Sequence, residues 1–340
     1  MTQFSTRFFI LFLSLSALLS LALPNRGFCE EPEEKGELNI SEIIIHHVLD
    51  DHVWHFADGL VLPLPVIVYS GEKGLDIFLS SHFYDEHHNP QAYRGYVLEH
   101  GHIVLEDSPE VGVLDLSITK NVAMLFINAL VLLWVFLSVS KGYKKNAGKA
   151  PSGIQSFMEP VIIFIRDEVV KPNIGARYEV FLPYMLTLFF FILFGNLLGL
   201  MPGAANLTGN IAVTGTLAVL TFILTNVNGN KGYWAHVFWT PGVPFLLRPI
   251  ILLVEFIGLF TKPFSLMIRL FVAITAGHIV LLSLISLAFI FASIYVGFGA
   301  TLIVLFINLI EILVAGIQAY VFTLFSSLYI GMAIVEHEHH

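Results

Sequence analysis

Long apolar runs dominate the second half of this chain and predict helices that cross a membrane. The runs at residues 118–139, 181–200 and 206–225 each come close to the 20 or so apolar residues that a helix needs to span a bilayer core. Polar stretches separate them, and the short loop MPGAAN joins the second run to the third as a hairpin. The pattern therefore predicts ordinary membrane helices at these places.

The last two apolar runs are too long for ordinary spans. Residues 249–289 and 300–335 hold 41 and 36 residues, so as helices they would measure about 62 and 54 Å against a hydrocarbon core of about 30 Å. A tilt of about 20°, the average for membrane helices, does not absorb this excess. Either each run breaks into two helices, or the two lie steeply tilted. Only Pro263 interrupts them, and a membrane helix tolerates proline, so we predict a steeply tilted hairpin of two continuous helices.

The earlier part of the chain follows different patterns. In residues 30–116 short apolar runs alternate with turn residues, and the pair YVLE and HIVLED predicts a β-hairpin within a small domain. Before it, an apolar run that ends near small residues is typical of a secretory signal at residues 1–29, with cleavage favoured over retention as an anchor. Residues 152–175 mix apolar and charged side chains, which predicts a helix at the cytoplasmic surface and not a span.

Composition makes the membrane assignment firm and divides the chain. Of the 340 residues, 56% are hydrophobic and only 13% are charged, where soluble domains have about 25% charged residues. Between residues 30 and 115 lie 18 of the 26 acidic residues and 9 of the 14 histidines. We therefore predict an all-α integral membrane protein with about five membrane helices at residues 117–340, preceded by an acidic, His-rich domain at residues 30–116.

Lysines fix the predicted orientation. The first membrane helix is followed by KGYKKNAGK, and Lys and Arg concentrate on the cytoplasmic side of membrane proteins. In the resulting topology the outer connections at residues 201–205 and 292–299 contain no Lys or Arg, whereas the inner ones hold Lys231 and Arg248. The chain is thus predicted to lie in the inner (plasma) membrane as a multi-pass protein, with its N-terminal domain outside and its C-terminus in the cytoplasm.

The histidines of the outer domain raise the question of a metal site. His46, His47 and Asp50 would share a face of a helix, but no closed set of ligands has the spacing of structural zinc sites. A water-exposed acidic surface is the favoured explanation, and no metal is predicted. Cys29 is the only cysteine, so no disulfide framework follows.

Charged residues inside the first long run carry the most information. Arg248, Glu255, Lys262 and Arg269 recur every seven residues, which places them along one stripe of a helix. Glu255 and Lys262 are best explained as a mutual pair. Arg269 costs roughly 2.5 to 3.5 kcal/mol to insert on experimental scales. Its helical neighbours at 265, 266, 272 and 273 are Ser, Leu, Val and Ala, so its partner must come from another segment.

Further along the two runs lie a histidine and a carboxylate. His278 follows Arg269 by nine residues, which turns it to the opposite side of the helix about 13 Å along the axis. In the final run Glu311 and Gln318 are seven apart and share a face. An imidazole and a buried carboxylate on neighbouring membrane helices suit proton passage. The alternative is that they only bind each other.

The order of these segments resembles a known family. GNLLGLMPG, then LVEFIGLFTKPFSLMIRLFVAITAGH, then EILVAGIQAYVFTLFSSLYIGMA is similar to subunit a of the F-type ATP synthase over residues 157–333. The resemblance implies that Arg269 is the essential stator arginine and that Gln318 stands near it. It also implies that His278 and Glu311 form the outer half-channel pair. Many members have Asn four residues after the arginine, where this chain has Ala273.

The function implied is that of a proton-translocating stator with two offset half-channels, with Glu255 assigned to the inner one. The implied partners are the carboxylates of the c-subunit ring, the peripheral-stalk b subunits, the rest of the ATP synthase complex and the lipid bilayer. No nucleic-acid contact and no cofactor are predicted, and no phosphate-binding Gly-rich loop indicates a nucleotide site, so the chain is expected to be a non-catalytic subunit. Whether the ion is a proton or sodium depends on the rotor carboxylate, which lies on another chain.

Two alternatives belong to other classes. A stand-alone proton-coupled transporter or channel would be expected to place its site at broken helices of paired repeats, and no repeat is found in the sequence. An outward-facing metal sensor anchored in the membrane leaves Arg269 unexplained.

Overall fold

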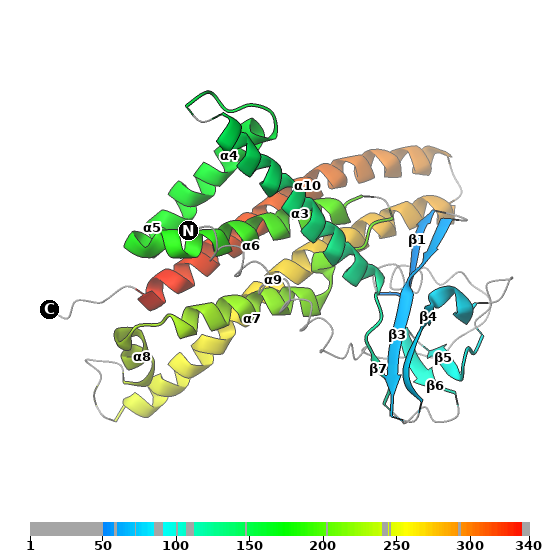
Figure 1. Cartoon of the computed structure of the whole chain (residues 1–340), viewed down its shortest axis with the longest axis horizontal. Helices are drawn as coiled ribbons and strands as arrows, with labels where there is room; N and C mark the ends of the chain where they lie inside the picture. The colour runs from blue at the N-terminus through cyan, green and yellow to red at the C-terminus, as the bar shows by residue number, and fades with distance from the viewer. Residues whose placement is uncertain are drawn as a thin grey trace.

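The computed structural model of the chain describes residues 50–334, apart from 58–59, 72, 85–90, 100, 107–111, 147, 202, 240–243, 245 and 292–293. The predicted signal peptide and the sequence around His46 and His47 lie outside the described residues. A body of long helices carries a small β module at one end (Figure 1).

The β module is built from short antiparallel strands. β1 (Val53–Ala57) pairs with β2 (Leu60–Pro63), and β3 (Pro65–Ser70) lies between β4 (Gly74–Leu79) and β7 (Leu114–Asp115). A 3₁₀ turn, η1 (Ser80–Phe83), leads away from β4. β5 (Tyr96–Glu99) and β6 (His102–Leu105) form the hairpin expected from YVLE and HIVL, so that prediction is confirmed.

Alternation along β3 gives the module a core of its own. Val66 and Val68 are fully buried and pack with Phe78, Tyr96 and Ile103, among others. Their sequence neighbours point to the other face of the sheet, as the period of two in a strand requires. The module is therefore a separate small body that needs a defined attachment to the helices.

The helical body begins with α3 (Lys120–Lys145). The next helical stretch runs through α4 (Ile154–Phe164), the π-helical turn η2 (Ile165–Val170), α5 (Lys171–Ile174) and η3 (Gly175–Arg177) into α6 (Tyr178–Gly199). After η4 (Leu207–Gly209), α7 (Ile211–Val227) meets α8 (Lys231–Phe238) at a bend of 105°. Within the described residues, four helical segments are long and apolar enough to cross a membrane, or five if α7 and α8 count as one span.

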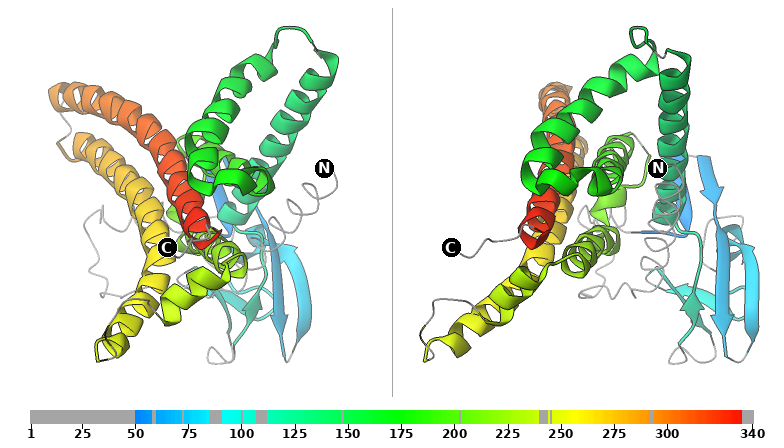
Figure 2. Two further views of the ribbon diagram at one scale, coloured as in Figure 1. Left: turned by 90° about the vertical axis from the view of Figure 1, so that its left-hand side faces the viewer. Right: turned by 60° about the vertical axis from the view of Figure 1, so that its left-hand side comes forward.

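The two long C-terminal runs form continuous helices. α9 (Arg248–Phe291) has 44 residues and includes Pro263, and α10 (Ile294–Ile334) has 41. They lie side by side and curve together (Figure 2). Helices of about 62 to 66 Å fit a core of about 30 Å only when steeply tilted. Of the two arrangements that the sequence left open, the structure has the unbroken hairpin.

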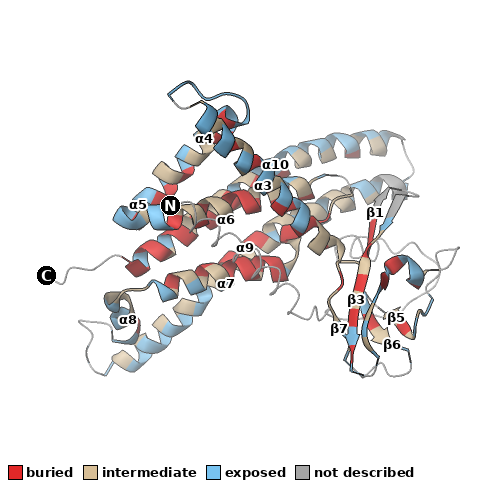
Figure 3. Cartoon of the chain, viewed as in Figure 1, coloured by how far each residue is buried: buried red, intermediate tan, exposed pale blue. Residues whose placement is uncertain are grey.

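Helix α6 is the centre of the body. Its side chains at Met185, Leu188 and Ile192 are completely buried, and the core cluster around them includes residues from α3, α7, α9 and α10. Where α9 passes into α10, exposed apolar side chains such as Phe291 and Phe298 are frequent, and the first part of α10 is mostly pale blue in Figure 3. Such surfaces suit lipid or another apolar protein surface.

The chain just before β1 attaches the module to the body. The Thr119 hydroxyl donates to Asp50 Oδ2 (2.8 Å) and the Asn121 N–H donates to Asp50 Oδ1 (3.1 Å), so Asp50 caps the start of α3. Trp54 Nε1 donates to the backbone carbonyl of Gly203 (2.6 Å), in the loop after α6. These contacts join segments that are far apart in the sequence.

His52 lies in the same junction. It is buried, and its Nε2 is 2.8 Å from Asp115 Oδ2. Burial by itself lowers the pKa of His52, but the hydrogen bond and charge of Asp115 outweigh that effect and raise it. For Asp115 the directions are reversed: burial by itself raises its pKa, but the hydrogen bond and charge of His52 outweigh that effect and lower it.

A pH dependence of the junction follows. The stabilisation from His52 is complete below the ordinary imidazole pKa of about 6.5 and is lost as the pH rises through its raised folded-state value. The stabilisation from Asp115 is present above the ordinary pKa of about 3.9 and is lost as the pH falls below it. We therefore expect limited proteolysis of the β module to be slowest between about pH 4.5 and 6.5 and to accelerate above that range. Asp115→Asn should flatten the alkaline limb, and a wild-type module that is better protected at pH 8.5 than at pH 6 contradicts this assignment.

Candidate functional site

Arg269 lies in the middle of α9, where it meets α10. Its guanidinium carbon is 4.4 Å from the centroid of the Phe325 ring, and its Nη2 is 3.5 Å from the hydroxyl of Ser265, one turn earlier on α9. Its Nη1 is buried and has no hydrogen-bond partner among the described residues. The charged group is thus held by a ring and one long hydrogen bond, and it retains an unused donor.

Glu311 lies nearer the start of α10, two steps of seven residues before Phe325. Its side chain is buried, and its Oε2 lacks a hydrogen-bond partner within the part of the chain that the structure describes. Its carboxylate rests against Gly277 of α9, because a Cβ added at that glycine would lie 2.6 Å from Glu311 Oε1. His278 is the next residue after Gly277. The predicted histidine and carboxylate therefore belong to the same stretch of the contact between α9 and α10.

Gln318 lies midway between Glu311 and Phe325 along α10. It lies seven residues after Glu311 and seven before Phe325, so the three side chains follow one face of the helix in steps of about 10.5 Å. The predicted nearness of Gln318 to Arg269 stays a prediction.

Two polar residues that sequence reasoning missed hold α10 in place. Asn196 of α6 donates to the carbonyl of Ala315 (3.2 Å), one turn after Glu311. The hydroxyl of Thr208 in η4 donates back to Asn196 Oδ1 (2.6 Å), and both side chains are buried. The sequence does contain a sign of this contact, because Asn196 lies inside the apolar run FGNLLGL and a buried polar group in a membrane helix needs a partner. This pair braces the segment that carries Glu311.

The part of the stripe nearest the start of α9 differs from the sequence prediction. Glu255 Oε1 is 3.9 Å from His236 Nδ1 of α8, and Lys262 Nζ lies 5.6 Å from the centroid of the Tyr329 ring on α10. The mutual pair expected of Glu255 and Lys262 is thus replaced by partners on neighbouring helices. Seven residues separate the two along α9 by about 10.5 Å, which is far for a direct ion pair.

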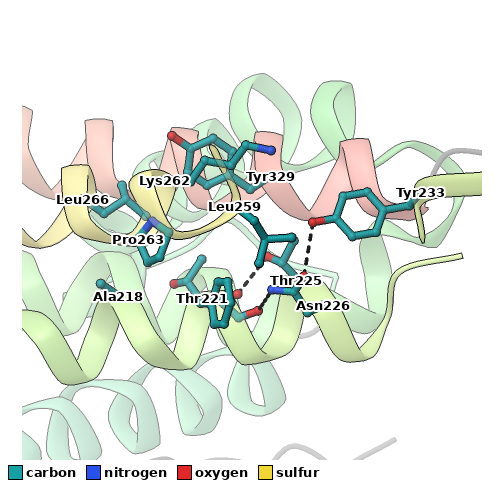
Figure 4. Close-up of a pocket in the computed structure, with 11 residues that line it drawn as sticks. Ala218, Thr221, Thr225, Asn226, Tyr233, Leu259, Lys262, Pro263, Leu266 and Tyr329 are labelled. Atoms are coloured by element: carbon teal, nitrogen blue, oxygen red, sulfur yellow. Dashed lines mark hydrogen bonds between the residues drawn. The ribbon is translucent and has the colours of Figure 1, made fainter. Parts of the chain in front are cut away.

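A small cavity lies between α7, α8, α9 and α10 (Figure 4), and the part of α9 that lines it precedes Arg269. Its polar lining comes from Thr221, Thr225 and Asn226 of α7, Tyr233 of α8, Lys262 and Tyr329. At one end the Tyr233 hydroxyl donates to Asn226 Oδ1 (3.2 Å). The lining carries hydroxyl, amide and ammonium groups that can hydrogen-bond water.

The described part of the β module shows no grouping of three or more His, Cys, Asp or Glu side chains arranged to hold a metal ion. His46, His47, His87, His88 and His100 lie outside the described residues.

Comparison with known proteins settles the family. A family model described as ATP synthase A chain matches residues 122–331. The chain belongs to this family. It is 48% identical to ATP synthase subunit a of Chloroherpeton thalassium over 236 residues, which cover 68% of this chain and 70% of that protein.

Other relatives extend the match toward the N-terminus, into the β module. The similarity to ATP synthase subunit a 2 of Prosthecochloris aestuarii is 42% identity over 314 residues, or 90% of this chain and 83% of the relative. ATP synthase subunit a of Pelodictyon phaeoclathratiforme is 39% identical over 333 residues, 95% of this chain and 85% of the relative. A second family model, described as a domain of unknown function, matches residues 43–122. As a member of the ATP synthase A chain family with several apolar helices, the chain is a multi-pass membrane protein.

Proposed function

We propose that this chain is the proton-translocating stator subunit of an ATP synthase, which offers two offset half-channels to a rotating ring of c subunits. Membership of the ATP synthase A chain family supports this function. The mechanism rests on a single observation, the environment of the Arg269 guanidinium. The guanidinium is part-buried, lies over the Phe325 ring and has no acidic partner among the contacts of the described residues, so its charge is available to a carboxylate of another chain.

The outer half-channel runs past His278 and Glu311 in this proposal. A proton enters from outside, passes these groups and neutralises a carboxylate of the c ring, which then rotates into lipid. The contact between Glu311 and Gly277 supports the pathway, since it brings a carboxylate from α10 to the turn of α9 that carries His278. Gln318 lies between this level and Phe325 on the same face of α10 and completes the path toward Arg269.

The inner half-channel begins on the side of Glu255. The polar cavity is lined by residues of α9 that lie between Glu255 and Arg269 along the helix. Water in this cavity would accept the proton that the rotor carboxylate releases. Arg269 then favours the ionised carboxylate and blocks direct passage of protons from one half-channel to the other. Each charge that crosses yields about 2.3 kcal/mol per 100 mV of membrane potential, so several are needed for one ATP.

Orientation and partners complete the proposal. Residues 30–116 form the outward-facing domain, residues 117–340 form the stator, and the C-terminus is cytoplasmic. The c-ring carboxylates face α9 and α10, and the peripheral-stalk b subunits hold the chain against the rotor with the rest of the complex. The lysines after α3 support the cytoplasmic assignment of that end.

Arg269→Ala is expected to abolish ATP-driven proton pumping while the complex still assembles, because the packing faces of α9 remain. Arg269→Lys should restore little of the activity, since an ammonium lacks the planar donor fork of the guanidinium. Pumping by inverted membrane vesicles and the subunit content of the purified complex are the two measurements. Coupled pumping at the wild-type rate in Arg269→Ala vesicles would overturn the proposed stator mechanism.

Gly277→Ala provides a test of the outer pathway that leaves both titratable residues in place. The added methyl group meets the Glu311 carboxylate at 2.6 Å and must displace it, so proton entry should slow about tenfold or more. A double-mutant cycle should show that Gly277→Ala and Glu311→Gln are strongly non-additive.

Gly297→Ala is the matched control for this test. A Cβ at Gly297, also in the long hairpin, meets no atom within 4 Å, so the rate of pumping should stay unchanged. Equal rates for Gly277→Ala, Gly297→Ala and the wild type would remove Glu311 from the pathway.

A further inference from the structure

The support of the Arg269 guanidinium comes from a neighbouring helix. The Phe325 ring of α10 lies 4.4 Å beneath it, whereas the hydrogen bond to Ser265 is long at 3.5 Å. The position one turn further along α9, where an i+4 side chain reaches back to Arg269, is occupied by Ala273 and offers no acceptor. The face of this ring and one long hydrogen bond are therefore the support that the described residues give this cation.

The ring itself is fixed in place. Its centroid is 6.1 Å from that of Tyr329, one turn later on α10. The Tyr329 ring in turn lies 5.6 Å from Lys262 Nζ. Two cations seven residues apart on α9 thus rest on two rings four residues apart on α10. Both contacts cross the interface between the two helices, at neighbouring turns of α10.

An aromatic ring has a property that a carboxylate or amide support lacks. Its face attracts a cation through its quadrupole, but it neither neutralises the charge nor takes up the guanidinium N–H donors. A permanent acidic partner would compete with an incoming carboxylate for Arg269. A ring holds the guanidinium in position and leaves its charge available.

We propose that Phe325 is the positioning residue for Arg269, and that its π-face fixes the guanidinium in the orientation that receives the rotor carboxylate. This rests on the proposed stator function. Phe325 exchanges no proton and touches no reacting atom, and its effect is exerted through Arg269 alone.

Stepwise fluorination of the Phe325 ring is the decisive experiment. Site-specific incorporation of mono-, di- and trifluorinated phenylalanine at position 325 weakens the attraction of the ring for a cation while hardly changing its size. The coupled pumping rate of the assembled complex in vesicles should fall with each added fluorine, by about fivefold over the series. The passive proton conductance of the membrane sector should rise in parallel. A ring that acts only by filling space predicts equal rates across the series, and that result would overturn the proposal.

Substitutions provide independent evidence and controls. Phe325→Leu should lower pumping at least as much as the trifluorinated ring, whereas Phe325→Tyr, which keeps the π-face, should retain it. Adding Ala273→Asn to Phe325→Leu places an amide oxygen one turn from Arg269 and should restore part of the loss. Phe298→Leu, the same change at an exposed ring near the start of α10, should have no effect.

The outcomes separate this inference from the stator function itself. If Arg269→Ala abolishes pumping but the fluorinated series is flat, the stator function stands and the role of Phe325 is refuted. If Arg269→Ala pumps normally, the stator function fails whatever the series shows. A graded series together with rescue by Ala273→Asn supports both.

Discussion

The cost of placing the charge of Arg269 among apolar helices governs the rest of this structure. Insertion scales put that cost at roughly 2.5 to 3.5 kcal/mol, and a desolvated cation–π contact of the kind made with Phe325 offsets up to about 2 kcal/mol. The hydrogen bond to Ser265 is too long to close the difference. Part of the cost of burying the charge is thus left uncompensated, and an anionic partner would offset it. A stator needs such an uncompensated charge, because a fully satisfied arginine would not respond to a passing carboxylate.

Arg269 can meet a carboxylate at a defined place only if the two long helices keep their relative position. Small residues at Ala315 and Ala319 are completely buried and allow close approach to α10, as membrane helix interfaces require. Asn196 fixes the backbone of α10 near Glu311, with Thr208 satisfying the other end of the amide. Near the end of α10, the backbone carbonyl of Asn173 comes so close to Gly331 that no Cβ fits there. The hairpin is therefore supported along one side, while the end at which α9 passes into α10 carries many exposed apolar side chains.

The sequence predicted the helices and faces well because both follow from local rules. Run length, together with the lack of any interruption except Pro263, indicated the tilted hairpin, and the spacing of seven placed Arg269 on a defined stripe. Spacing carries no information about which side chain on another helix will face that stripe. For this reason Phe325 and Gly277 were missed, and Glu255 was assigned to Lys262 when His236 is its neighbour. The hairpin of the β module was predictable from alternation and turn residues, whereas the attachment of the module through Asp50 and Trp54 depends on contacts across more than 60 residues.

Cysteine accessibility along α9 in the assembled complex tests most directly whether Arg269 and His278 face different environments. Single cysteines at positions 266–282, in a background with Cys29→Ser, would be treated with a water-soluble thiol reagent from outside, since only a thiolate in contact with water reacts. The account predicts labelling on the His278 face toward the outer end. It also predicts that positions on the Arg269 stripe escape the reagent and crosslink to a cysteine beside the rotor carboxylate. Equal labelling of both faces from outside would mean that α9 lines one continuous pore, and it would contradict a stator with two separate half-channels.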